Sequence, residues 1–273
     1  MMNRLAGIGK SSRERLSNVL EHNPGVITSS IVADTVGVSP KEANRLLSRW
    51  HKNGWLSRVK RGAYISVPID STTSDILVEE PFLIAESLYH PGYVAGFSAV
   101  KHWDLSEQII ETVYYFSTKQ VKNLKPVHGG IRFQLKTIKQ YKLFGTKTLW
   151  YGSRKVKISD PTKTLIDLFD DPALVGGMTV VYDILAEYLA SDHCNYNKML
   201  EYAERMNNKS ILKRLGFVFD TKLEVMPDEF VGIEENLSAG YSKFDPAIEC
   251  SRTVEKWKLK VPASWKDEYD RKK

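Results

Sequence analysis

Cysteine is scarce in this sequence, and long apolar runs are absent. Its 273 residues include two cysteines, Cys194 and Cys250, and no Cys-x-x-Cys pair, which argues against a disulfide framework or a structural zinc site. The sequence has no run of about 18 apolar residues, so no membrane helix is predicted. The N-terminal residues lack the apolar core of a signal peptide. We therefore expect a cytoplasmic protein without a metal site.

Acidic residues are scarce in the first quarter of the chain. Residues 1–66 contain 11 Lys/Arg and four Asp/Glu, a net charge of +7, whereas the remaining 207 residues carry −1. A cationic excess confined to one segment is typical of contact with a polyanion such as nucleic acid. A basic surface that serves only solubility is the alternative.

The clearest local pattern lies in residues 39–67. Ser39 is a favourable N-cap, Pro40 fits the first helical position, and Glu42 completes a capping box. Four apolar residues then recur at helical spacing and predict a buried stripe: Ala43, Leu46, Leu47 and Trp50. The opposite face of this predicted helix carries polar and cationic side chains.

The elements around this helix follow the order of a winged helix-turn-helix. We expect helices over residues 12–22, 29–36 and 40–52 and strands over residues 56–59 and 63–67. The hairpin tip is Lys60-Arg61-Gly62, whereas a purely structural hairpin more often carries Asn-Gly or Asp-Gly. A three-helix packing module without DNA contact is the alternative.

A winged helix-turn-helix reads DNA with its third helix, in the major groove, while the hairpin tip touches the backbone or the minor groove. We therefore predict that the polar face of the helix and the hairpin tip contact double-stranded DNA. The predicted DNA-binding residues are Lys41, Asn44, Arg45, Ser48, Arg49, Lys52, Lys60 and Arg61.

Residues 112–159 lack acidic side chains altogether and contain 11 Lys/Arg. Apolar and cationic residues alternate with period 2 over residues 131–136 and 155–158, which predicts strands that are apolar on one face and basic on the other. The face is either a second anion-binding surface, for DNA, RNA or an acidic protein, or a solvated lysine-rich face. The residues predicted for this second basic surface are Arg132, Lys136, Lys139, Lys155 and Lys157.

The C-terminal half reads mainly as helices. Asp160-Pro161 opens a helix as N-cap and first residue, and further helices are expected over residues 179–190, 195–206 and 210–215, the last closed by Gly216. We expect a final strand over residues 254–261 and a loose tail after it. Residues 220–249 carry eight Asp/Glu and two Lys. We expect this acidic segment either to lie against the basic sheet or to be a solvated loop region.

Two groups of reactive side chains raise enzymatic alternatives. The cluster Asp160, Lys163, Asp167 and Asp170 suggests a metal-dependent nuclease, but capping accounts for Asp160, and no Glu or Lys on a neighbouring strand has nuclease spacing. His193-Cys194 is an adjacent pair, and adjacent side chains rarely point toward each other, so a loop position is favoured over a catalytic pair.

The order of these segments resembles the AbiEi-type antitoxin family of type IV toxin–antitoxin systems, over roughly residues 12–261. Each motif is short, and their order is more specific than any one of them. The motifs are Gly54-Trp55-Leu56, Arg61-Gly62-Ala63-Tyr64, Pro81-Phe82-Leu83-Ile84-Ala85, Gly92-Tyr93-Val94-Ala95-Gly96-Phe97-Ser98-Ala99, Ser159-Asp160-Pro161-Thr162-Lys163-Thr164-Leu165-Ile166-Asp167, Phe244-Asp245-Pro246 and Lys256-Trp257-Lys258-Leu259. Ala63 stands where the family usually has a glycine.

The resemblance implies a winged helix that represses the protein's own operon by binding inverted repeats in promoter DNA. It also implies a C-terminal domain that counters a nucleotidyltransferase-like toxin, generally without a stable complex. Neither the toxin nor its neutralisation follows from charge or spacing.

Taken together, the sequence predicts an α+β protein: an N-terminal winged helix-turn-helix followed by a mixed α/β domain with a basic-faced sheet. The expected domains are residues 1–67 for DNA binding, 68–80 as a linker, and 81–273 for antitoxin activity, with a subdivision near residue 175 as an option. We expect a non-enzymatic autorepressor and antitoxin, without a cofactor, acting on DNA as a monomer or dimer. The alternatives are a repressor whose C-terminal domain senses a small molecule and a nucleic-acid enzyme that uses the basic sheet.

Overall fold

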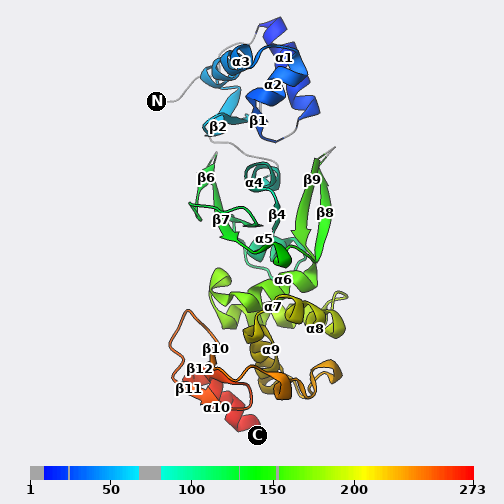
Figure 1. The fold of residues 1–273 in the computed structure, drawn as a ribbon, viewed down its shortest axis with the longest axis vertical. Coiled ribbons are helices and arrows are strands. Elements are labelled where there is room, and N and C mark those ends of the chain that lie inside the picture. The colour runs from blue at the N-terminus through cyan, green and yellow to red at the C-terminus, as the bar shows by residue number, and fades with distance from the viewer. Residues whose placement is uncertain (1–8, 24, 68–80, 129, 152–153) are drawn as a thin grey trace. The chain divides into compact units, whose positions relative to one another are not determined.

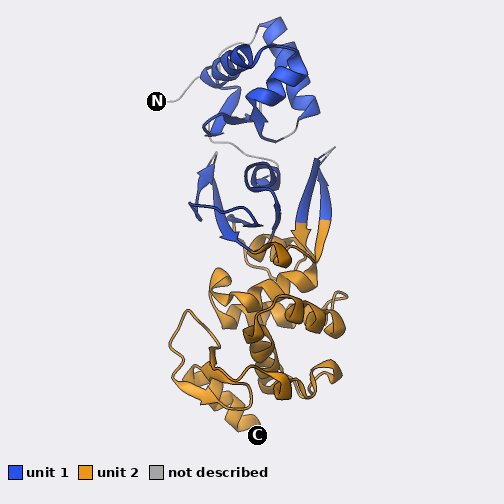
Figure 2. Cartoon of the chain, in the orientation of Figure 1, with its two compact units in different colours: residues 1–94, 111–138, 148–157 blue, residues 95–110, 139–147, 158–273 orange. Residues whose placement is uncertain are grey.

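The computed structural model describes residues 9–23, 25–67, 81–128, 130–151 and 154–273. Its contacts divide the chain into two units, which Figure 2 colours separately. Unit 1 comprises residues 1–94, 111–138 and 148–157, and unit 2 comprises residues 95–110, 139–147 and 158–273. The predicted linker, residues 68–80, lies outside the described residues, and the predicted domain boundaries stay a prediction.

The N-terminal part of unit 1 has the predicted winged-helix order, at the top of Figure 1. Its elements are α1 Lys10–His22, β1 Ile27–Thr28, α2 Ser29–Val36, α3 Pro40–Lys52, β2 Leu56–Lys60 and β3 Ala63–Ser66. The strands form an antiparallel sheet in the order β1-β3-β2. The predicted apolar stripe of α3 is buried, and Trp50 is fully enclosed against Leu16 and Val19 of α1. Packing this stripe leaves the opposite face of α3 in water.

Local sequence accounts for the ends of these helices. The Ser39 hydroxyl accepts a hydrogen bond of 3.2 Å from the Glu42 backbone N–H and caps α3. Gly37 ends α2 with a φ of +70°, a left-handed conformation that glycine adopts without strain. This turn at Gly37 sets the direction of α3 relative to α2.

The rest of unit 1 is one helix and most of a mixed six-stranded sheet, of which residues 146–147 and 158–159 belong to unit 2. The elements are α4 Pro81–Tyr89, β4 Gly92–Val94, β5 Val113–Ser117, β6 Val127–His128, β7 Ile131–Thr137, β8 Thr146–Tyr151 and β9 Arg154–Ser159. The strand order is β6-β7-β5-β4-β9-β8, with β5 and β7 parallel. In Figure 1, α4 lies between the β6–β7 side and the β8–β9 side of the sheet.

Side-chain contacts agree with that placement of α4. On the β6 side, the Tyr89 hydroxyl lies 2.6 Å from the His128 ring. At the centre, the Tyr115 hydroxyl donates to Glu86 at 2.7 Å. On the β9 side, Arg154 donates to the Ser87 hydroxyl at 3.2 Å. Helix α4 therefore covers one face of the sheet from β6 to β9.

Unit 2 is mainly helical and is built around α6, which is buried along nearly its whole length. The helices are α5 Gly96–His102, η1 Gln140–Lys142, α6 Pro161–Asp170, η2 Pro172–Val175, α7 Met178–Ala190, α8 Tyr196–Arg205, α9 Lys209–Lys222, η3 Asp228–Phe230, η4 Ile233–Asn236 and α10 Ala263–Lys272. A small sheet has the order β10-β12-β11, from strands β10 Ser242–Lys243, β11 Arg252–Val254 and β12 Leu259–Val261. Among the described residues, no helix combines the length and the apolar run needed to cross a lipid bilayer.

The sequence predicts a helix that ends at Gly216, but α9 continues to Lys222. A Cβ at Gly216 would lie 2.0 Å from a ring carbon of Trp257, so the glycine makes room for an indole that packs on the helix. The Trp257 Nε1 then donates to Asp220 on the same helix at 2.8 Å. A distant tryptophan, and not a helix stop, explains this glycine.

The C-terminal end also differs from the prediction. The expected single strand over residues 254–261 is a hairpin of β11 and β12, with a turn in which Lys258 has a φ of +49°. The expected loose tail is helix α10, which buries Trp265 and Tyr269. The Trp265 ring centroid lies 4.7 Å from that of Phe244, so an aromatic cluster stabilises a segment whose composition is polar.

Ser98 has the residue type of a helix cap but does not cap a helix. Helix α5 starts at Gly96 with Ala95 at the N-cap position, and Ser98 is buried inside the helix. Serine is a common cap residue, but here its hydroxyl lies within the packed interior, where propensity is overruled by tertiary contacts.

Candidate nucleic-acid interface

The polar face of α3 is the first part of the candidate interface. At about 100° per residue, Lys41, Asn44, Arg45, Ser48, Arg49 and Lys52 fall within an arc of about 140° opposite the buried stripe. All six side chains are exposed. The structure thus places every predicted residue of this helix on one solvent-facing surface.

Two of these side chains make local contacts that bear on recognition. Arg45 lies 3.5 Å from Glu42, and its side chain is 65% exposed. Such an exposed pair stabilises little, so it does not hold the guanidinium in place. The Asn44 amide donates one N–H to the Pro40 carbonyl at 3.0 Å, which leaves its second N–H and its oxygen for other partners.

The wing tip is the second part of the interface. Lys60 pairs with Ala63 across the hairpin, which leaves Arg61-Gly62 as a two-residue loop. Gly62 has a φ of +77°, so glycine is needed for the tight turn. Lys60 and Arg61 are exposed, as predicted.

Arg58 is an exposed cation of the wing that the sequence prediction did not include. Its Nε lies 3.4 Å from the Lys60 carbonyl across the irregularity between Arg58 and Lys60 in the β2–β3 pairing. The signal was present in the sequence, because Arg58 and Lys60 are two residues apart on a strand.

A histidine links the wing to the larger sheet of unit 1. His128 Nδ1 lies 2.7 Å from the Val59 carbonyl on β2, and Nε2 lies 2.6 Å from the Tyr89 hydroxyl. Burial lowers the pKa of His128; the hydrogen bond to Val59 opposes this, and the nearby charge of Lys60 adds to it. Burial also raises the pKa of Tyr89 to about 12. A neutral imidazole therefore donates to Val59 and accepts from Tyr89.

The second basic surface forms on the sheet face opposite α4. On β7, Leu135 pairs with Tyr115 on the α4 side, so Arg132 and Lys136 point to the opposite face. On β9, the Arg154 contact with α4 places Lys155 and Lys157 on that opposite face as well. The predicted alternation is confirmed by buried Phe133, Leu135, Val156 and Ile158.

This face is less uniform than the sequence suggested. Tyr93 and Phe116, on the central strands β4 and β5, share it with the cations and are buried. Arg132 pairs with Glu111 at 3.0 Å, whereas Lys155 is exposed with its Nζ 4.5 Å from the Trp150 ring centroid. Lys139 is exposed but belongs to unit 2. The face is thus basic on β7 and β9 and apolar at its centre.

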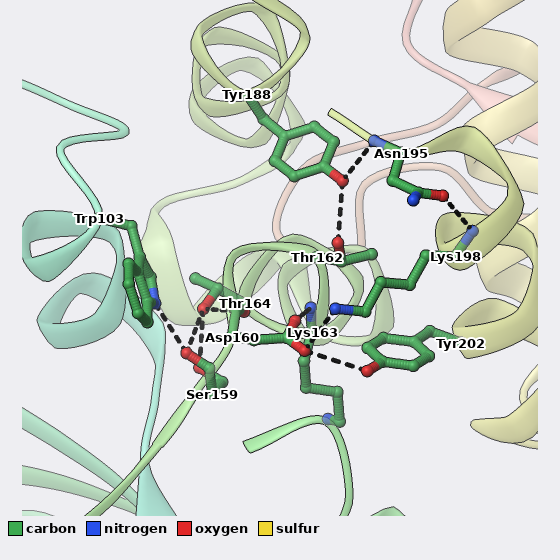
Figure 3. A network of polar contacts seen from close by, with 10 residues as sticks. All are labelled: Trp103, Ser159, Asp160, Thr162, Lys163, Thr164, Tyr188, Asn195, Lys198 and Tyr202. Atoms are coloured by element: carbon green, nitrogen blue, oxygen red, sulfur yellow. Dashed lines mark hydrogen bonds and ion pairs between the residues drawn. The ribbon is translucent and has the colours of Figure 1, made fainter. Parts of the chain in front are cut away.

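The polar cluster of α6 holds helices of unit 2 together (Figure 3). The Asp160 carboxylate accepts three hydrogen bonds: from the Lys163 backbone N–H at 2.8 Å, from Lys198 at 2.8 Å and from the Tyr202 hydroxyl at 3.0 Å. Burial alone lowers the pKa of Lys198, but its hydrogen bond and ion pair with Asp160 raise it overall. Asp160 therefore caps α6 and also fastens α8 to it.

The other members of the suspected nuclease cluster have separate partners. Lys163 is fully buried and forms an ion pair with Asp167 one turn later. Burial lowers the pKa of Lys163, and Asp167 partly offsets this. Asp170 accepts from Lys142 at 2.8 Å. Each carboxylate is thus bonded to a lysine, and the arrangement serves packing around α6.

Comparison with known proteins adds evidence of family and fold. Residues 14–67 match the family described as "Transcriptional regulator, AbiEi antitoxin". Comparison with the curated proteins found no match. The chain is similar to the crystal structure of the RV2827C protein from Mycobacterium tuberculosis, with a TM-score of 0.61, 14% identity, and coverage of 94% of this chain and 93% of that one. At this identity the likeness concerns the fold, and the predicted resemblance to the AbiEi family is confirmed over residues 14–67.

Proposed function

We propose that the protein is a transcriptional autorepressor that binds inverted repeats in its own promoter and also acts as the antitoxin of a type IV toxin–antitoxin operon. The observation that carries the DNA-binding part is the exposed polar face of α3 beside the two-cation wing tip. The family match over residues 14–67 supports both parts.

The two parts of the interface differ in the DNA groups that they are suited to contact. An arginine reads guanine by donating two hydrogen bonds to its O6 and N7 atoms in the major groove. Arg45 and Arg49 are the better candidates for base contact, because each is an exposed arginine, whereas the Asn44 amide is already held by its bond to the Pro40 carbonyl. Lys60 and Arg61 at the wing tip hold phosphates, which position the protein without reading sequence.

DNA binding is tested by fluorescence anisotropy with the upstream promoter duplex across a salt titration. Arg45→Ala or Arg49→Ala is expected to cost about 1–3 kcal/mol on the operator and little on unrelated duplex. Lys60→Ala is expected to weaken all duplexes alike and to reduce the salt slope by about 0.9. Arg15→Ala, an exposed arginine on α1, is the matched control. Wild-type binding by Arg45→Ala, Arg49→Ala and Lys60→Ala would show that this face is not the DNA interface.

The antitoxin part assigns a non-enzymatic role to residues 81–273. We infer that they counter a nucleotidyltransferase-like toxin without a stable complex. Co-expression with the neighbouring toxin gene from a foreign promoter tests this. The double variant Arg45→Ala/Arg49→Ala is expected to lose repression of the operon and to keep full protection. Loss of protection in that variant would show that the two activities are not separable, and failure of the wild type to protect would refute the antitoxin assignment.

A further inference from the structure

One tryptophan of unit 1 is exposed to water. Trp150 on β8 is 61% exposed, whereas the other five tryptophans of the chain are buried or half-buried. Strand β8 is at the edge of the six-stranded sheet and pairs with β9 to form a hairpin, on the right in Figure 1. An exposed indole costs hydration free energy, so its surroundings indicate what could cover it.

Those surroundings are cationic. Lys155 on β9 has its Nζ 4.5 Å from the centroid of the Trp150 ring, and Lys157 is exposed two residues further along the same strand. Residues i and i+2 lie on one face about 6.6 Å apart, so the two ammonium groups form a row beside the indole. We call Thr148, Trp150, Lys155 and Lys157 the Trp150 patch.

The segment that carries the patch has no acidic residue. Residues 112–159 contain no Asp or Glu, and Lys136 and Arg132 lie on the same face of the sheet. Lysine ammonium groups beside an aromatic ring are held there by the electron-rich ring face. The patch therefore offers a flat apolar surface and cations at the same place, which suits a ligand with flat apolar rings and a regularly charged backbone.

We propose that the Trp150 patch binds single-stranded nucleic acid, with a base stacked on the Trp150 indole and neighbouring phosphates held by Lys155 and Lys157. A duplex is a poorer fit, since its bases are stacked on one another and its outer surface offers the indole only charged phosphates. An unpaired base has a free ring face, and stacking on an aromatic side chain tolerates any base. The site is distinct from the duplex interface proposed for α3 and the wing.

The test is fluorescence anisotropy with labelled oligonucleotides of about 12 nucleotides, as single-stranded RNA, single-stranded DNA and a duplex without the operator. Trp150→Ala in the full chain is expected to weaken binding of the single strands about tenfold and to leave operator binding unchanged. The double variant Lys155→Ala/Lys157→Ala is expected to flatten the salt slope by about 1.4, which corresponds to two phosphate contacts on a single strand. The RNA and DNA arms distinguish the two sources of the strand.

Matched controls separate the site from general effects of charge and exposure. Tyr241 is an exposed aromatic residue beside Glu255, and Arg252 is an exposed cation elsewhere in the chain. Tyr241→Ala and Arg252→Ala are expected to bind single strands as the wild type does. The double variant Lys60→Ala/Arg61→Ala at the wing is expected to lose affinity for the operator duplex and to keep its affinity for single strands. Failure of the duplex proposal can therefore be distinguished from failure of the single-strand proposal.

Three results would overturn the proposal. One is equal single-strand affinity of wild type and Trp150→Ala. A second is loss of duplex binding in Trp150→Ala to the same extent as single-strand binding. The third is displacement of the oligonucleotide by poly-glutamate of equal charge, which would make the patch a site for any acidic chain. Thermal melting of Trp150→Ala close to that of the wild type shows that the variant is folded, as an exposed side chain predicts.

Discussion

Replacing Asp160 is the sharpest test of how unit 2 is held together. Its carboxylate caps α6 and contacts two side chains of α8, and the side chain of Asp160 is 6% exposed. Asp160→Ala removes all three hydrogen bonds at once. Loss of an N-cap costs about 1 kcal/mol, and leaving the buried Tyr202 hydroxyl without its acceptor costs about 1–2 kcal/mol more. The Lys198 side chain is 35% exposed, so water replaces much of its lost partner.

We therefore expect Asp160→Ala to lower the stability of unit 2 by about 2–4 kcal/mol. Asp160→Asn keeps the capping oxygen Oδ1 but places an amide N–H2 donor where Oδ2 accepts from Tyr202 and Lys198. It is expected to cost about 1 kcal/mol less than Asp160→Ala, which is the contribution of the cap. Asp192→Ala, an exposed loop aspartate, is the control and is expected to change little.

Hydrogen–deuterium exchange followed by mass spectrometry measures this loss locally, which matters because a chain of two units need not unfold in one step. Peptides from α6 and α8 are expected to exchange faster in Asp160→Ala, while peptides from α1 to α3 keep their protection. Equal exchange in the Ala and Asn variants would show that the cap contributes nothing. Protection of α6 that depends on Mg²⁺ and disappears in Asp160→Ala would instead revive the metal-site alternative.

Two further predictions concern contacts that no local pattern reveals. Gly216→Ala puts a methyl group 2.0 Å from the Trp257 ring. Although alanine is the better helix former, this strain is expected to lower the free energy of unfolding by about 1–3 kcal/mol. A higher melting temperature of the variant would contradict the contact. The pKa of His128 is lower in the folded protein than in the unfolded chain, so the neutral imidazole stabilises the fold. This stabilisation is present above about pH 6.5 and is lost as the pH falls through the lowered pKa of the folded state. His128→Asn keeps a donor toward Val59 and cannot titrate, so its melting temperature is expected to fall less than that of the wild type on acidification, and parallel curves would contradict the assignment.

The sequence by itself determined those features that depend on neighbours a few residues away. Caps at Ser39 and Asp160, the period-3.6 stripe of α3 and the period-2 alternation of β7 and β9 all appear in the structure as expected. The exposed polar face of α3 followed from the same reasoning, because a helix that buries one stripe must turn the opposite side to water. Their role in DNA binding stays a prediction.

Tertiary structure decided the features that depend on residues far apart in the chain. The local sequence predicts a helix end at Gly216, but the Trp257 ring occupies the space beside this glycine within the helix. The polar tail forms α10 because Trp265 packs on Phe244. Exposure of Trp150 was equally hidden, since a tryptophan in a strand is usually assigned to the core. Local propensities contribute less than about 1 kcal/mol per residue, whereas burial of one large aromatic side chain contributes about 1.5–3 kcal/mol, so distant packing partners decide these positions.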